Sequence, residues 1–321
     1  MKSISRYMLS VAILLVLLPV LSVEAHAQRR ITALMFSEEP RYLEALKGVT
    51  DTLAKAGYKE PGTVIKVLNG KGNKIKTLEL VKEIAADKPD LIVTLGTYAS
   101  SAVSSTIKDV PIVFSIVYDP VMAGISKNWQ SSGNNTTGSS SKIAMTRIME
   151  SLGQFSSVKT LAVLYTPAEK NSVEVLKDLQ TIEAGYKIRI LPVRLSTIEE
   201  IHQLLPEVLR SAGALYITGS NLIGGQIAQI TDMATKAKVL TISHLEDLVE
   251  SGVLMGVCAD SYAMGVDDGE KAVKVLKGAK PSSIPINKAK KNDVLLNMKT
   301  AHKGQFQIPE AFMKTVTRKI E

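Results

Sequence analysis

Short apolar runs alternate with longer segments of helical period along most of the chain. Short runs rich in β-branched and aliphatic residues are typical of strands buried on both faces of a sheet. The runs that predict strands lie at residues 31–36, 63–68, 91–95, 112–116, 160–165, 188–192, 214–218, 239–242 and 254–257.

The segments between these runs predict amphipathic helices. Segment 40–56, for example, places Leu43, Leu46, Val49 and Leu53 along one side of a helix. The same period predicts helices at 74–86, 98–107, 171–184, 197–211 and 262–277. Strands that alternate with helices form βαβ units, and right-handed crossovers wind them into a parallel sheet covered on both faces. The chain is therefore predicted to be a doubly wound α/β protein.

A polar loop divides this pattern near the middle of the chain. Residues 128–138, NWQSSGNNTTG, lie between two series of βα units. This many strands favours two parallel-sheet lobes joined by a hinge over one large sheet, although no sequence repeat relates the two halves. We expect the first lobe to contain residues 28–140 and 259–284, and the second lobe to contain residues 141–258 and 285–321.

The first 27 residues have the pattern of an export signal. Two basic residues precede an apolar run at 8–23, and residues 25–27, AHA, form a small-x-small cleavage site. The alternative is a membrane anchor, but the run is short for the roughly 20 apolar residues that spanning needs. We expect cleavage after Ala27 and a periplasmic protein. It is not expected to be a lipoprotein, because the only cysteine is Cys258.

Composition argues against several function classes. The formal net charge is +8, but the basic residues are scattered and the export signal argues against nucleic acid as a partner. The apolar surroundings of Cys258 favour a buried small hydrophobe. His202, His244 and His302 are far apart, and no P-loop or nucleophile elbow is present. We therefore expect no enzyme activity, no metal and no cofactor.

Polar residues follow several of the predicted strands. Ligands of such folds bind at the carboxyl ends of the strands, so these residues are the candidate binding site. Small donors at a helix start suit a carboxylate or phosphate, carboxylates suit a ligand cation, and tyrosines can stack on a flat ligand. The residues expected to contact the ligand are Thr97, Tyr98, Ala99, Ser100, Tyr118, Asp119, Ser139, Ser140, Ser141, Asn171, Asn221, Asp260 and Tyr262.

Each type of candidate also has a structural alternative. Thr97 and Asp260 precede helical segments and could serve as helix caps. Asp119 stands before a proline, where aspartate often begins a turn. The tyrosines could be partly buried with only the hydroxyl in water.

Taken in order, these segments resemble the extracytoplasmic ABC-transporter substrate-binding family that includes tryptophan- and tyrosine-type binding components. The matching segments are GTYA (96–99), PIVF (111–114), VYDPV-x-AG (117–124), N-x-TG (135–138), LYTP-x-E-x-NS (164–172), ALY (214–216), DSY (260–262) and LN-x-KTA (296–301). The resemblance implies a fold like that of type I periplasmic binding proteins. It also implies a small-molecule solute, a membrane ABC permease with its ATPase as partner, and a monomer.

Two departures from the family pattern concern the ligand. The family commonly has Ser-Asp after N-x-TG, whereas this chain has residues 139–142, SSSK. The family often has Thr-Asp-Asn after ALY, whereas this chain has Gly219-Ser220-Asn221. A buried ammonium group needs a partner, so the loss of these acids weakens the case for an α-amino acid. Lys142 would instead favour an anionic ligand if it faces the cleft.

The expected function is capture of a small polar or aromatic solute, amino-acid-like or other, in an interlobe cleft. The lobes would close on a hinge, and the solute would pass to an ABC importer. The alternative is an extracytoplasmic ligand sensor of the same fold that docks onto a membrane receptor. An exported hydrolase would need a nucleophile–base pair that the sequence does not show.

Overall fold

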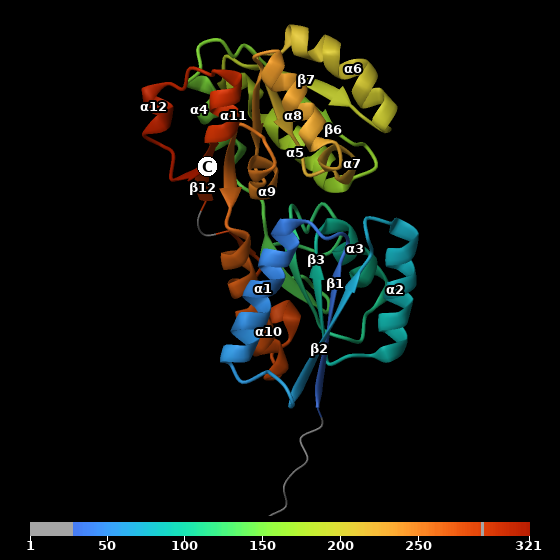
Figure 1. Ribbon diagram of the computed structural model, residues 1–321. Coiled ribbons are helices and arrows are strands. Elements are labelled where there is room, and N and C mark those ends of the chain that lie inside the picture. The colour runs from blue at the N-terminus through green and yellow to red at the C-terminus, as the bar shows by residue number, and fades with distance from the viewer. Residues whose placement is uncertain (1–27, 290–291) are drawn as a thin grey trace, which may run out of the picture.

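The computed structural model describes residues 28–289 and 292–321. Figure 1 shows two lobes, one above the other, each built around a β-sheet with helices on its faces. The predicted fold class, α/β with two parallel-sheet lobes, is confirmed. The predicted export signal at residues 1–27 lies outside the described residues. Within the described ranges, no helix has both the length and the apolar character needed to cross a membrane.

The first lobe contains a six-stranded sheet in the order β11-β5-β4-β3-β1-β2, and its pairings are parallel. Its strands are β1 (Arg29–Met35), β2 (Thr63–Asn69), β3 (Leu91–Leu95), β4 (Ile112–Val117), β5 (Thr136–Ser140) and β11 (Asn287–Lys288). Its helices are α1 (Pro40–Lys55), α2 (Lys74–Asp87), α3 (Thr97–Thr106), α10 (Ser261–Leu276) and the 3-10 turn η2 (Pro281–Ser283).

The second lobe contains a seven-stranded sheet in the order β13-β12-β10-β9-β8-β6-β7, in which the pair of β10 and β12 is antiparallel. Its strands are β6 (Thr160–Tyr165), β7 (Arg189–Arg194), β8 (Ala214–Ile217), β9 (Leu240–Ser243), β10 (Met255–Ala259), β12 (Asn292–Asn297) and β13 (Arg318–Ile320). Its helices are α4 (Met145–Gly153), α5 (Lys170–Ile182), η1 (Glu183–Gly185), α6 (Ile198–Ser211), α7 (Asn221–Gly224), α8 (Ile227–Lys236), α9 (Glu246–Glu250), α11 (Met298–Gly304) and α12 (Glu310–Met313).

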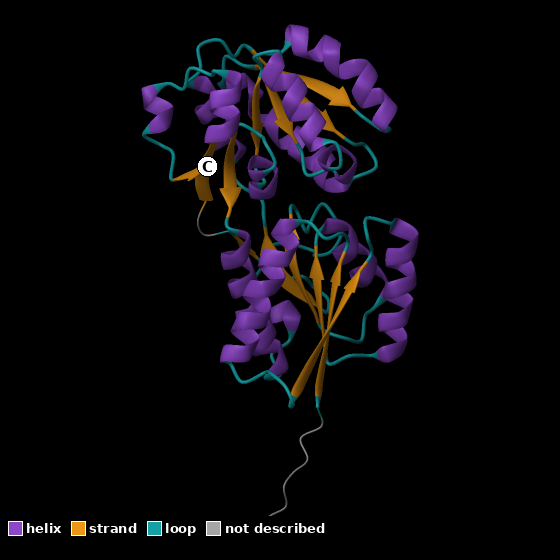
Figure 2. Ribbon diagram, in the orientation of Figure 1, coloured by secondary structure: helices purple, strands orange, loops and turns teal. Residues whose placement is uncertain are grey.

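The two sheets repeat one strand order, which the sequence does not reveal as a repeat. In the first lobe, β1 lies between β2 and β3, and β4 and β5 follow. In the second lobe, β6 lies between β7 and β8, and β9 and β10 follow. Figure 2 shows the strands of the lower lobe pointing toward the upper lobe. The carboxyl ends of these strands, where such folds bind ligands, therefore face the gap between the lobes.

The sheets place the lobe boundaries slightly differently from the sequence-based prediction. The chain passes between the sheets after β5, after β10 and after β11. Residues 287–288 belong to the first sheet, where β11 pairs with β5, although residues 285–321 were expected in the second lobe. Ala259 ends β10 in the second sheet. The predicted loop at 128–138 also runs into β5. Four strands were not predicted, namely β5, β11, β12 and β13. The residues of β5 and β11 are polar, so hydrophobic patterning gives no signal for these two.

Glycines allow α10, which returns from the second lobe, to pack closely on α1. A Cβ atom on Gly265 would lie 2.0 Å from the Ala45 carbonyl oxygen, and one on Gly48 would lie 2.4 Å from the Tyr262 carbonyl oxygen. These neighbours are backbone atoms, so no side-chain rotation could relieve such a contact. Glycine at both positions therefore fixes α10 against the first lobe.

Candidate functional site

A cavity of about 190 Å³ lies between the lobes, and we call it the inner cavity. Residues that follow β1 and β3 line it from the first lobe, and residues that follow β6 and β8 line it from the second. These are equivalent, neighbouring strands in the two sheets. The fold thus brings four strand ends to one point, which is where open α/β sheets bind their ligands.

Aromatic side chains form the first-lobe wall of the inner cavity. The ring centroids of Phe36 and Tyr98 are 5.0 Å apart in an edge-to-face arrangement. Tyr42 also lines the cavity and packs against Gly96. A Cβ atom on Gly96 would lie 2.5 Å from the Tyr42 hydroxyl oxygen, and the Gly96 φ of +90° favours glycine. This wall presents apolar rings to a ligand.

A carboxylate faces the cavity from the second lobe. Glu169 Oε1 accepts hydrogen bonds from Ser220 Oγ at 2.9 Å and from the Asn221 backbone N–H at 3.1 Å. Its Oε2 accepts from Asn221 Nδ2 at 2.9 Å. These neutral donors hold the carboxylate in place without neutralising it, and within residues 28–289 and 292–321 it forms no ion pair. The site therefore suits a ligand cation.

The side-chain amide of Asn221 has a free acceptor at the same place. Its Oδ1 is buried and accepts no hydrogen bond among the described residues. A buried acceptor without a donor costs free energy, roughly 1–3 kcal/mol, unless a ligand or water supplies one. Together with Glu169, Asn221 makes this end of the cavity rich in acceptors.

Groups that suit an anion lie on the first-lobe side. Thr97 is the first residue of α3, and no side chain caps this helix. The free N–H groups of a first turn and the helix dipole favour a negative ligand group. Lys74 Nζ lies 5.5 Å from the centroid of the Tyr98 ring. The inner cavity thus has an apolar wall, an acceptor-rich end and a donor-rich end.

A wider groove of about 770 Å³ adjoins the inner cavity and shares Gly219 and Asn221 with it. We call it the outer groove. Glu38 and Glu39 line it from the first lobe, and Asp247 lines it from the second. Both lobes therefore line the outer groove as well as the inner cavity.

Four of the predicted ligand residues meet in the inner cavity: Thr97, Tyr98, Asn171 and Asn221. The Asn171 side chain already makes one hydrogen bond within the protein, because its Nδ2 donates to the Gly219 carbonyl oxygen at 2.7 Å. The helix-cap alternative for Thr97 is wrong, since Gly96 occupies the N-cap position.

The two residues that follow in α3 point away from the cavity. Ala99 belongs to the apolar core of the first lobe. The Ser100 side chain is fully buried, and its Oγ donates to the Gly96 carbonyl oxygen at 2.8 Å. Successive helix residues face different directions, so a ligand that touches Thr97 and Tyr98 does not also reach these two side chains.

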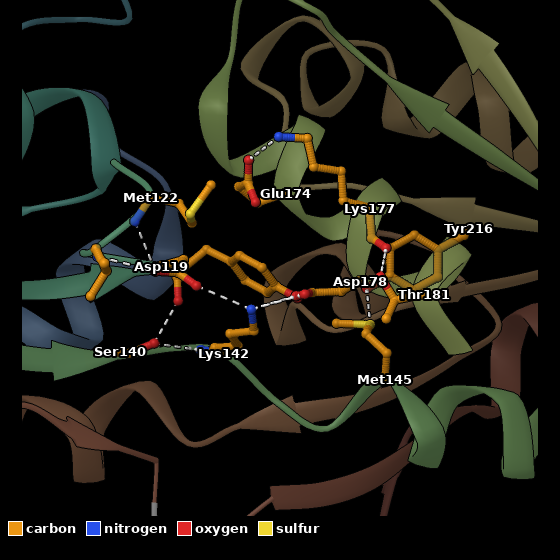
Figure 3. A network of polar contacts seen from close by, with 12 residues as sticks. Asp119, Met122, Ser140, Lys142, Met145, Glu174, Lys177, Asp178, Thr181 and Tyr216 are labelled. Atoms are coloured by element: carbon orange, nitrogen blue, oxygen red, sulfur yellow. Dashed lines mark hydrogen bonds and ion pairs between the residues drawn. The ribbon is translucent and has the colours of Figure 1, made fainter. Parts of the chain in front are cut away.

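Three predicted ligand residues instead belong to a polar network at the hinge (Figure 3). Tyr118 donates its hydroxyl hydrogen to Asp178 Oδ2 at 2.6 Å, which joins the first lobe to α5 of the second. Asp119 Oδ1 accepts the backbone N–H groups of residues 121 and 122 at 3.1 Å, which confirms the turn alternative. Ser140 Oγ donates to the Tyr118 carbonyl oxygen at 2.5 Å.

Lys142 is the cation of this hinge network. Its Nζ lies 3.1 Å from Asp119 Oδ2 and 2.7 Å from Asp178 Oδ2. Burial alone would lower the pKa of Lys142, but its hydrogen bonds to the two carboxylates outweigh that effect and raise the pKa. Two carboxylates thus satisfy this ammonium group, and it does not line the inner cavity. The hypothesis that Lys142 selects an anionic ligand receives no support from its position.

The remaining predicted residues lie outside the inner cavity. Ser139 Oγ donates to Asp267 Oδ2 at 2.9 Å and accepts from Lys271 Nζ at 2.6 Å. Ser141 is buried at the crossover after β5. The cap alternative for Asp260 is confirmed, because its Oδ1 accepts the Ala263 N–H at 2.9 Å. Tyr262 donates its hydroxyl hydrogen to Asp51 Oδ2 at 3.0 Å.

Sequence reasoning did not single out Glu169 or Arg41 as functional. Glu169 stands in the segment LYTP-x-E, so the family resemblance contained a signal for it. Arg41 forms an ion pair with Asp247 across the lobes, with Nη1 and Oδ2 2.5 Å apart. No local sequence pattern predicts this ion pair, because 206 positions separate the two residues.

The fold and the interlobe cavity define a two-lobed solute-binding protein. The family model described as "ABC transporter substrate binding protein" matches residues 30–320. The chain therefore belongs to the family of ABC transporter substrate-binding proteins.

Individual relatives agree with this assignment. The chain is 26% identical over 279 residues to a tyrosine-binding protein of Clostridioides difficile, covering 86% of this chain and 81% of the relative. A structure from Streptococcus pneumonia in complex with L-Trp has a TM-score of 0.86 and 26% identity, covering 91% of this chain and 100% of that chain. The ligand-free, open structure of a Clostridium difficile substrate-binding protein with adhesive properties has a TM-score of 0.72 and 25% identity, with the same coverage.

Proposed function

We propose that this protein is the exported solute-binding component of an ABC importer and that it carries an aromatic amino acid in the inner cavity. The combination of groups in that cavity carries the proposal. An amino acid presents an ammonium group, a carboxylate and a side chain, and the cavity offers a separate surface for each. The export signal predicted at residues 1–27 supports a periplasmic location, where a membrane permease can receive the solute.

The ammonium group would bind at the acceptor-rich end. This chain has Ser220 and Asn221 where related sequences often have Asp-Asn, so an acid is missing from that segment. Glu169, which lies in the family-matching segment LYTP-x-E, supplies an acid at this place, because its carboxylate lies within hydrogen-bond distance of both Ser220 and Asn221. The negative charge therefore comes from the loop after β6 rather than from the loop after β8. Asn221 Oδ1 gives the ammonium group a second acceptor.

The carboxylate and the ring of the solute would bind to the first lobe. The start of α3 at Thr97 offers N–H donors, and Lys74 adds a positive charge nearby. Phe36 and Tyr98 offer apolar rings to an aromatic side chain, which prefers edge-to-face or offset contacts with them. Tyrosine, for which one relative is named, and L-Trp, which is bound in the structure of another, have this combination of groups.

Hinge closure would couple binding to delivery. At nearly equal identity, the structure is more similar to the L-Trp complex (TM-score 0.86) than to the ligand-free, open relative (TM-score 0.72). This difference supports the interpretation that the lobes have a closed arrangement here. A solute that contacts both lobes binds the closed form better and so shifts the population toward it.

Isothermal titration calorimetry with L-tryptophan and L-tyrosine tests the proposal. We expect saturable binding of at least one of them, and loss of about tenfold or more in affinity for analogues that lack the ammonium group. Glu169→Gln should cause a similar loss for the amino acid and little further loss for the deaminated analogue. Glu310→Gln, at an exposed position on α12, is the matched control. If neither amino acid binds, the proposal is contradicted.

A further inference from the structure

The ion pair of Arg41 and Asp247 joins the two lobes. Arg41 lies in the first turn of α1 in the first lobe, and Asp247 lies in α9 of the second lobe. Arg41 Nη1 and Asp247 Oδ2 are 2.5 Å apart, and each side chain is only 7% exposed. The pair forms only while α1 and α9 lie side by side, so any lobe movement that separates these helices must break it.

The same guanidinium group supports the wall of the inner cavity. Arg41 Nη2 lies 2.8 Å from Glu39 Oε2, and Arg41 Cζ lies 4.8 Å from the centroid of the Tyr42 ring. Tyr42 lines the inner cavity, whereas Arg41 and Asp247 line the outer groove. The ion pair thus touches a residue of the binding wall without lining the inner cavity itself.

Among the residues that the structure describes, Arg41 is the one ion-pair partner of Asp247. Its second oxygen, Oδ1, is buried and accepts no hydrogen bond among the described residues. Removal of the Arg41 charge would leave a buried carboxylate unpaired on both oxygens, which is costly in the closed form. In a more open form, water could solvate the same carboxylate. The loss of Arg41 therefore penalises the closed form more than the open form.

We propose that Arg41 is a positioning residue for solute binding: paired with Asp247, it stabilises the closed arrangement of the lobes and fixes Tyr42 in the cavity wall. This inference rests on the proposed function, because it assumes that the solute binds between the lobes. Interactions that form on closure retain the solute after it has entered. Their loss should therefore appear in the dissociation rate more than in the association rate.

Stopped-flow fluorescence with L-tryptophan measures both rates. Arg41→Gln and Asp247→Asn should each raise the dissociation rate at least tenfold and change the association rate less than threefold. The double variant should have a dissociation rate no higher than those of the single variants, because both substitutions act through one ion pair. Arg41→Lys keeps the positive charge, so its dissociation rate should lie between those of the wild type and Arg41→Gln. Lys47→Gln is the matched control, since Lys47 forms an exposed pair with Asp51 on the same helix.

Lobe distance measured without solute separates this inference from the proposed function. Fluorescent labels at Lys55→Cys in α1 and Glu207→Cys in α6 report the distance between the lobes, and the native Cys258 is buried. We expect Arg41→Gln to shift the distribution toward longer distances even without L-tryptophan. This comparison still decides the role of Arg41 if L-tryptophan fails to bind, although that failure would refute the proposed function.

Two results would overturn the inference. One is an unchanged distance distribution together with an unchanged dissociation rate in Arg41→Gln. The other is that Arg41→Gln raises the dissociation rate by the same factor in the Asp247→Asn variant as in the wild type. Arg41 would then act on the solute directly. Urea unfolding of each variant shows whether a change in rate comes from loss of the folded protein.

Discussion

The inner cavity and the hinge network both place charged groups between the lobes, but they differ in how fully those groups are satisfied. In the hinge network, Lys142 is paired with Asp119 and Asp178, and Tyr118 donates to Asp178. In the inner cavity, only neutral protein donors hold Glu169, and Asn221 Oδ1 has no donor within the described ranges.

This difference separates a structural polar cluster from a binding site. Satisfied buried charges stabilise one arrangement of the chain and have little left to offer a ligand. Acceptors held in place without a matching cation are ready to bind one. The contrast places Tyr118, Asp119 and Lys142 in the hinge network, and it supports the proposal that Glu169 and Asn221 contact the solute.

The largest expected effect is the loss of the Lys142 charge. Lys142→Met leaves Asp119 and Asp178 without their cation, so we expect the free energy of unfolding to fall by about 3 kcal/mol. Urea unfolding measures the change. Adding Asp178→Asn should restore part of the stability, because it removes one of the unpaired carboxylates.

The control for this prediction is Lys177→Met. Lys177 is 56% exposed and pairs with Glu174 on the same helix as Asp178. We expect its loss to cost less than about 0.5 kcal/mol, as for most exposed pairs. Equal effects of the two substitutions would mean that the hinge network contributes no more than a surface ion pair.

His244 is expected to make stability depend on pH. Burial, together with the nearby Arg41 charge, lowers its pKa from 6.5 to about 3. The unfolded chain therefore binds a proton more readily than the folded protein between about pH 3 and 6.5. The contribution of His244 is fully present above pH 6.5 and is lost as the pH falls toward 3.

We expect His244 to account for about 2 kcal/mol of lost stability between pH 7 and pH 4.5. Urea unfolding of the wild type and of His244→Phe at both pH values measures the loss of unfolding free energy that is due to His244, since phenylalanine does not titrate. His202→Phe, at an exposed position of α6, is the control. A His244→Phe variant that loses as much stability on acidification as the wild type would refute the prediction.

Asn221→Ala tests the acceptor-rich end with a smaller expected effect. The substitution removes the unsatisfied Oδ1 and one donor to Glu169. We expect affinity for an aromatic amino acid to fall about tenfold, or about 1.4 kcal/mol, while the unfolding free energy changes by less. Calorimetry and urea unfolding of the same preparation give both values. A variant that loses stability but keeps full affinity would assign Asn221 to structure instead.

Tyr98→Phe should have the smallest effect. The ring, which packs edge-to-face on Phe36, stays in place, and only the hydroxyl is removed. We expect affinity to change by about twofold or less, whereas Tyr98→Ala should weaken binding about tenfold because the apolar wall is lost. If Tyr98→Phe matched Tyr98→Ala in calorimetry, the hydroxyl rather than the ring would recognise the solute.

Much of the fold could be predicted from the sequence because it depends on local periodicity. The leucines of segment 40–56 predicted a helix, and α1 spans Pro40–Lys55. The strand β5 escaped prediction because its sequence, TTGSS, is polar although all of it is buried. Hydroxyl groups satisfied by hydrogen bonds fill the place that apolar side chains usually take, as Thr137 Oγ1 does by donating to the Ile284 carbonyl oxygen at 2.9 Å.

The site could be predicted only in outline. Of the residues predicted from strand ends, Thr97, Tyr98, Asn171 and Asn221 line the inner cavity, because sheet topology determines where strand ends meet. The same rule could not exclude Ser100 or Lys142, whose roles depend on side-chain direction and on partners far away in the sequence. Glu169 was missed for the same reason, since its importance arises from Ser220 and Asn221 across a loop.

Small-angle X-ray scattering with and without saturating L-tryptophan is the most direct test of the account. The account predicts that L-tryptophan makes the wild-type protein more compact, with a smaller radius of gyration. Glu169→Gln should need a higher concentration of L-tryptophan to reach the same value. The contradicting result has two parts: calorimetry shows that L-tryptophan binds, and scattering shows that the lobes are apart both without and with it. The solute would then not be held by closure between the lobes.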